Sequence, residues 1–252
     1  MSIAKPFKRT VRQLADGSYQ RSGNGRYVRN SGYAVDGPHY LRGFQVLQKD
    51  ILELFDYIEP SDINLPCYSF RTLELLGRIC VEIEANCRAI LAENGYARAI
   101  NHSSNLNMAD YCKIEASHKL SKYTVRLPVW QGSGGDRIPF ASWGTTDKSL
   151  SWYQSYNATK HSRYGNFRQG NFGNMIDAIC GLAAIVSAQF MNEDFGETFM
   201  VTEAGPGDGF EFASGGYFLV KFPDNWPASE RYDFNWHTLQ SDPEPFQNFP
   251  YP

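Results

Sequence analysis

Apolar residues recur at intervals of three and four positions in several stretches of the chain, the spacing that predicts amphipathic helices. These stretches are residues 40–58, 69–93 and 172–191, with a shorter one at 107–119. A further, more polar helix is expected to begin near Asp147 or Ser149, because either side chain suits an N-cap. Helices should therefore dominate the middle of the chain.

A second period, the alternation of apolar and polar residues, predicts short strands. It occurs over 123–130 and again near the C-terminal end, over 198–203, 209–213 and 217–222. Between the last two, Ser214-Gly215-Gly216 has the composition of a hairpin turn. The two periods together predict a mainly α fold, a helical bundle with a small β appendage at the C-terminal end.

Composition divides the chain into three parts. Residues 1–37 lack periodicity, and the first thirty of them hold seven Lys or Arg against one acidic residue, so we expect a basic flexible arm. Such an arm suits nucleic acid or an acidic surface; the alternatives are a solvated tail and docking on the chain's own acidic end. Residues 38–195 should form the bundle, with a strand and a Gly-rich loop inserted at about 121–146. Residues 196–252 should form short strands and an extended acidic tail packed on the bundle.

The sequence lacks the signatures of several classes of protein. No apolar run approaches the ~20 residues of a membrane span, and no N-terminal apolar segment indicates secretion. Five cysteines without Cys-x-x-Cys spacing indicate reduced thiols, so we expect a cytoplasmic protein that does not bind a membrane. Cys112 and His118 lack metal-ligand spacing, and the Gly-rich residues 132–137 lack the Gly-Lys-Ser/Thr ending of a phosphate loop. Neither a metal nor a cofactor is predicted.

The most concentrated chemistry lies in residues 156–163, Tyr-Asn-Ala-Thr-Lys-His-Ser-Arg. Asn157 and His161 are four positions apart and share one helix face. An imidazole, an amide and two cations within two turns suit a phosphate or another anion. The candidate site comprises the polar side chains of Asn157, Lys160, His161 and Arg163 as catalytic or phosphate-binding groups, with Tyr153 and Tyr156 as substrate-binding groups.

His161 also has a simpler interpretation, a helix-packing histidine bonded to Asn157 or to a carboxylate such as Glu82 or Glu84. Arg78 and Glu82 are four positions apart in the predicted helix over 69–93, and a structural salt bridge between them is expected.

The motif in residues 156–163, followed by an alanine-rich helix, resembles the motif region of HEPN-like helical proteins from bacteria. The string Pro-Asp-x-Trp-Pro that starts at residue 223, with the aromatic residues up to 236, resembles the tail of one uncharacterised branch. The resemblance spans about residues 35–250.

This resemblance implies a mechanism. HEPN ribonucleases use an arginine, then Asn, Asp or His, then three residues and a histidine, and they cut RNA without metal across a dimer by attack of the 2′-hydroxyl on the phosphate. Asn157 and His161 match the second and third elements, whereas Tyr156 stands where the family has its arginine. The missing guanidinium would hold the scissile phosphate, and Lys160 or Arg163 would have to replace it.

Two hypotheses follow. One is a metal-independent endoribonuclease with a defence or toxin role, homodimeric, with the motif helix near the dimer axis. The other is a non-catalytic HEPN-like module that binds nucleic acid, a nucleotide or a partner protein through the same patch.

Overall fold

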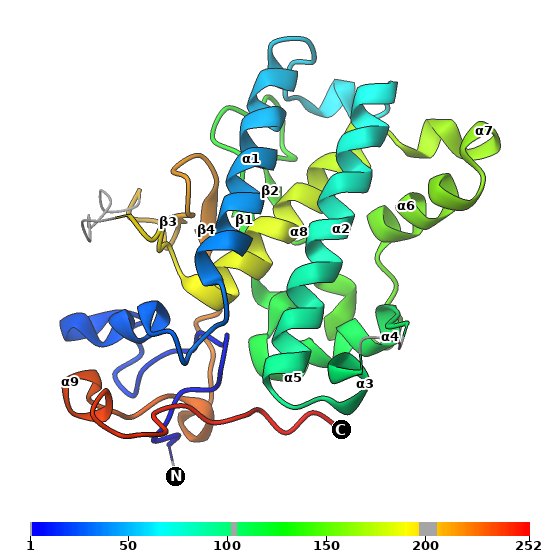
Figure 1. The fold of residues 1–252 in the computed structure, drawn as a ribbon. Helices are drawn as coiled ribbons and strands as arrows, with labels where there is room; N and C mark the ends of the chain where they lie inside the picture. Colours follow the sequence, from blue (N-terminus) through cyan, green and yellow to red (C-terminus); the bar gives the residue numbers. More distant parts are fainter. Residues whose placement is uncertain (1, 102–104, 197–205) are drawn as a thin grey trace.

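The computed structural model describes residues 2–101, 105–196 and 206–252. Its centre is α8 (Phe172–Phe190), against which α1 (Gly37–Phe55), α2 (Phe70–Glu93) and α6 (Ser151–His161) pack (Figure 1). Nearly every residue of α8 is buried, because apolar residues occupy all of its faces instead of one stripe. The predicted mainly α fold with a small sheet is confirmed.

The helix α8 has the length and apolar composition of a membrane-spanning segment, which the sequence patterns did not predict. In the structure, 83% of its most apolar window is buried inside the molecule. Its position at the centre of the bundle therefore accounts for its composition.

The predicted helices over 40–58, 69–93 and 172–191 correspond to α1, α2 and α8. Ser69 begins α2 as a capping box, in which its hydroxyl accepts a hydrogen bond of 3.1 Å from the Thr72 N–H. The helix predicted over 107–119 is instead a run of short turns, because its middle tightens to 3₁₀ geometry. These turns are α4 (Met108–Tyr111), η3 (Cys112–Ile114) and α5 (Glu115–His118). The other short helices are η1 (Arg21–Arg29), η2 (Asp62–Asn64), α3 (Ala97–Ile100), η4 (Leu120–Lys122), η5 (Ala141–Gly144), α7 (Arg163–Asn166), η6 (Phe167–Gln169), η7 (Ala228–Glu230) and α9 (Trp236–Leu239).

One antiparallel sheet joins the middle of the chain to its C-terminal part. The strands β1 (Thr124–Arg126), β2 (Asp136–Arg137), β3 (Glu211–Phe212) and β4 (Leu219–Lys221) lie in the order β2-β1-β4-β3. The sheet is therefore shared by the inserted segment and the C-terminal appendage. Pro128 ends the predicted strand over 123–130 early, since it offers no N–H to a ladder. The hairpin turn before β4 contains Gly215 and Gly216 with φ of +81° and +72°. The strand expected over 198–203 lies outside the described residues.

The N-terminal segment, expected as a flexible arm, packs on the rest of the molecule. Val11 and Tyr33 are fully buried. Residues 2–14 lie beside the C-terminal tail, with Ile3 bridged to Tyr232 (Figure 1). Lys5 forms an ion pair of 2.8 Å with Asp242. The basic segment is thus docked partly on the chain's own acidic end, and apolar burial holds it there.

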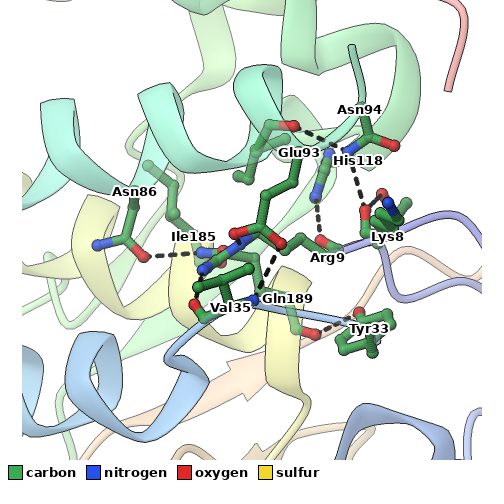
Figure 2. Close-up of polar contacts among 12 residues, drawn as sticks. Lys8, Arg9, Tyr33, Val35, Asn86, Glu93, Asn94, His118, Ile185 and Gln189 are labelled. Carbon is green, nitrogen blue, oxygen red and sulfur yellow. Dashed lines mark hydrogen bonds and ion pairs between the residues drawn. The ribbon is translucent and has the colours of Figure 1, made fainter. Parts of the chain in front are cut away.

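A buried arginine organises the contact between this segment and the bundle (Figure 2). Arg9 has no exposed surface, and its Nε donates to Glu93 Oε1 at 2.6 Å. Its Nη1 donates to Gln189 Oε1 at 2.9 Å, and its Nη2 to the Val35 carbonyl. Gln189 in turn donates to Asn86 Oδ1 at 2.8 Å. The guanidinium is therefore bonded from α2, α8 and the segment before α1.

His118 is another buried polar group of this region (Figure 2). Its Nε2 donates to the Arg9 carbonyl at 2.8 Å, which fixes the tautomer because a carbonyl only accepts. Its Nδ1 lies 2.6 Å from the Ser117 hydroxyl, which also contacts the Tyr251 hydroxyl. Burial lowers the pKa of His118 to about 4, so the imidazole is neutral at neutral pH.

Candidate functional site

The helix α6 carries the predicted site, and its inner face is apolar and aromatic. Trp152, Tyr153, Tyr156 and Thr159 are buried, while Lys160 and His161 are exposed. The Trp152 indole donates to the Pro139 carbonyl at 2.9 Å and fixes the start of the helix on the preceding loop. These contacts hold α6 in one orientation against the bundle.

Neither residue predicted as an N-cap of α6 has that role. The residue before the helix is Leu150, and no side chain caps it. Asp147 instead accepts a hydrogen bond of 3.0 Å from the Ser149 N–H, two positions along, in a local turn. The helix start is therefore set by burial of Leu150 and Trp152.

Tyr153, predicted as a substrate-binding residue, belongs to the core. It is only 8% exposed, and its hydroxyl donates to Glu84 Oε1 at 2.9 Å. Burial, and then this contact with the carboxylate, raise the pKa of Tyr153. Its hydroxyl is thus already bonded within the protein.

The structure divides the motif between two adjoining faces of α6. Tyr156 and Lys160 line a cleft of about 580 Å³ between α6, α1 and α2. Asn157 and His161 line a separate groove of about 480 Å³ on the adjoining face of the helix. Arg163 belongs to neither, because α6 ends at His161 and Ser162 (φ −147°, ψ 75°) redirects the chain into α7. The single convergent cluster expected from helical spacing is therefore not formed.

The groove beside His161 is lined by both apolar and polar side chains, and no guanidinium is among them. Gln154 and Asn166 line it with Asn157, and so does the small exposed part of Tyr153. His161 is exposed, and no hydrogen bond or ion pair joins its imidazole to another side chain in the described part of the chain. It is thus not the helix-packing histidine of the simpler interpretation, and Glu84 is bonded to Tyr153 instead.

The cleft between α1, α2 and α6 combines apolar walls with a charged rim. The apolar side chains of the lining are Val46, Leu47 and Val81, and two helix-interior glycines, Gly43 and Gly77, leave space between them. The charged or titratable groups around them are His39, Arg42, Arg78, Glu82 and Lys160. Side chains of both positive and negative charge, from three helices, thus line one cleft.

Arg78 and Glu82 do not form the predicted salt bridge. Arg78 Nη1 instead pairs with Asp50 across to α1 and with Glu74 Oε1 at 3.2 Å, one turn earlier on α2. The packing of α1 on α2 brings Asp50 within reach, and the guanidinium turns toward it. Glu82 is left facing the cleft, with its carboxylate against the backbone of Gly43, which has no side chain to displace it.

Three charged groups of the cleft have no ionic partner among the residues that the structure describes. The carboxylate of Glu82 receives neither a cation nor a hydrogen-bond donor, and the cations Arg42 and Lys160 contact no carboxylate. The interaction with the Tyr156 hydroxyl raises the pKa of Lys160, so it stays a cation at neutral pH. Groups of opposite charge are thus held in one cleft without neutralising each other.

Sequence reasoning found Lys160 and Tyr156 but missed Glu82, Arg42 and His39 as lining groups. Two glycines in the sequence could have indicated the cleft. Gly43 and Gly77 lie in helix interiors, where glycine is unfavourable unless space is needed beside the backbone. In the described residues, no group of three or more His, Cys, Asp or Glu side chains is arranged to hold a metal ion.

Comparisons of the chain with protein-family models, with curated proteins and with solved structures found no match. The resemblance to HEPN-like proteins is therefore carried by the motif in residues 156–163 and the tail alone.

Proposed function

We propose that this chain is a non-catalytic, HEPN-like helical module that binds a nucleotide in the cleft between α1, α2 and α6. One observation carries the proposal: Glu82, Arg42 and Lys160 line the same cleft and have no ionic partner in the described structure. Arg42 and Lys160 are exposed and Glu82 is half-buried, so all three charged groups are accessible to a ligand that enters the cleft. A concave site with apolar walls and a few polar groups is the usual form of a small-molecule site.

The chemistry of the lining favours a nucleotide over a simple anion. Arg42 and Lys160 suit a phosphate, and Glu82 accepts hydrogen bonds from the N–H groups of a base. Val46 and Val81 provide apolar contact for the planar ring. A volume of about 580 Å³ lies within the range of pockets that bury small ligands.

Titration calorimetry with nucleoside 5′-monophosphates and with the matching nucleosides tests this proposal. Arg42→Ala and Lys160→Ala are each expected to weaken binding of the monophosphate by about 10- to 150-fold, since a charge-assisted hydrogen bond contributes ~1.5–3 kcal/mol. The same substitutions should leave nucleoside binding nearly unchanged, because the nucleoside lacks the phosphate.

The matched control is Lys49→Ala, which removes an exposed cation of α1 that does not line the cleft. It should bind the monophosphate as the wild type does. Equal affinity for nucleoside and monophosphate, or loss of affinity in Lys49→Ala as well, would contradict the assignment of Arg42 and Lys160 to the phosphate.

The catalytic hypothesis is less well supported, because the groove of Asn157 and His161 lacks a guanidinium to hold a scissile phosphate. A second copy of the chain would have to supply one. We expect purified protein to leave RNA intact in the presence of EDTA, and His161→Ala to change the melting temperature by less than ~2 °C because the imidazole is exposed.

Cleavage that leaves 2′,3′-cyclic phosphate ends, and that falls by roughly 10²–10⁴-fold in His161→Ala, would instead establish a ribonuclease. Sedimentation at high protein concentration is the companion measurement. A dimeric mass is required for a composite site of that kind, whereas the cleft of the proposed module lies within one copy.

A further inference from the structure

Exposed aromatic rings gather where the start of α2 meets the segment after α6. Phe70, the first residue of α2, is 69% exposed, and Tyr68 is 42% exposed. Phe167 supports both, with ring centroids 4.8 Å from Phe70 and 5.6 Å from Tyr68. Tyr164 in α7 is fully exposed. Scattered apolar side chains are ordinary on a surface, but contiguous ones mark an interaction site.

Two arginines extend over these rings. The Arg163 guanidinium lies 5.8 Å from the centroid of the Phe70 ring, and the Arg168 guanidinium lies 5.8 Å from that of Tyr68. Neither arginine contacts a carboxylate within the described residues, whereas the neighbouring Arg71 is paired with Asp50 and Glu74. The surface therefore has uncompensated positive charge beside exposed aromatic rings.

We propose that this surface binds single-stranded nucleic acid. It is called here the aromatic–arginine surface and comprises Tyr68, Phe70, Arg163, Tyr164 and Arg168. Unpaired bases stack on aromatic rings, and guanidinium groups bind the phosphates between them. This site lies outside the nucleotide cleft, and it shares no lining residue with it.

The same features disfavour other anionic partners. A duplex presents phosphates but keeps its base faces stacked inside, so the rings would gain nothing from it. An acidic peptide would satisfy Arg163 and Arg168 but would not cover Phe70 and Tyr164 with planar groups. The net charge of the whole chain is −3, so binding has to depend on this local patch.

Fluorescence anisotropy with a short labelled oligouridine, measured over a range of salt concentrations, separates the two contributions. Phe70→Ala should weaken binding by about 5- to 100-fold, the usual loss for one stacked base, without changing the salt dependence. Arg163→Gln should lower the slope of log affinity against log salt by about 0.7, the value for one phosphate contact on a single strand. Both side chains are exposed, so both variants are expected to keep the wild-type melting temperature.

Ile100→Ala and Lys122→Gln are the matched controls, since each removes an exposed apolar or basic group outside the aromatic–arginine surface. Gly77→Leu, which fills the nucleotide cleft, should bind the oligouridine as the wild type does. Unchanged affinity in Phe70→Ala overturns the proposal. Equally tight binding of a duplex, or displacement of the oligouridine by an equal charge of polyglutamate, also overturns it, and the latter result would assign the surface to an acidic polypeptide.

Discussion

Replacing Arg9 by methionine is expected to lower the free energy of unfolding by about 3–5 kcal/mol, because it leaves the Glu93 carboxylate without its buried cation. The substitution also removes a donor to Gln189 inside the core. For a chain of this size each ~1 kcal/mol lowers the melting temperature by about 2–4 °C. Urea unfolding followed by circular dichroism measures the loss.

Two variants separate the charge effect from loss of volume. Lys8→Met replaces the adjacent cation, whose side chain lies nearer solvent, and should change the free energy of unfolding by less than ~0.5 kcal/mol. Arg9→Met with Glu93→Met removes both partners and should be less destabilised than the sum of the single variants. Additive losses in the double variant would show that the ion pair does not govern the stability of this region.

Acidification from pH 7.5 to 5 is expected to destabilise the wild type by about 2 kcal/mol more than His118→Gln. The folded protein holds the pKa of His118 at about 4, whereas an unfolded histidine titrates near 6.5. Between these values the unfolded chain binds the extra proton, so stability rises with pH across this window and is lost as pH falls. Most of the loss should occur between pH 6.5 and 4.

Glutamine at position 118 keeps a donor for the Arg9 carbonyl and an acceptor for the Ser117 hydroxyl, and it does not titrate. The carboxylates titrate alike in both proteins, so the difference between their pH profiles reports His118. Parallel profiles for wild type and His118→Gln would mean that this imidazole is not held neutral in the folded state.

The helices could be predicted from sequence because burial on one face leaves a regular pattern. In α1 the buried residues Leu41, Phe44, Leu47, Ile51 and Leu54 recur at the spacing of three and four positions that predicts a helix. The N-terminal segment could not be predicted in this way. Arg9 lies in a Gly-, Ser- and Arg-rich stretch, and its partners Glu93 and Gln189 are 84 and 180 residues away.

The candidate site was predicted only in part, for a similar reason. Helical spacing correctly gave Asn157 and His161 a common face and joined Lys160 to Tyr156. Helical spacing could not predict that α6 ends at His161. Because the chain changes direction there, Arg163 lies over the Phe70 ring. Helical spacing also could not predict the partner of Arg78, because Asp50 lies on another helix. Since Arg78 pairs with Asp50, Glu82 has no ion pair with Arg78 and faces the cleft.

Gly77 allows the most direct test of nucleotide binding. A side chain at this position meets no atom within 4 Å of its Cβ, so leucine should extend into the cleft without disturbing α2. Calorimetric titration with a nucleoside monophosphate should give binding to the wild type and to Gly77→Ala, and no measurable binding to Gly77→Leu at an unchanged or higher melting temperature. Wild-type affinity in Gly77→Leu would contradict the assignment of the cleft as the nucleotide site.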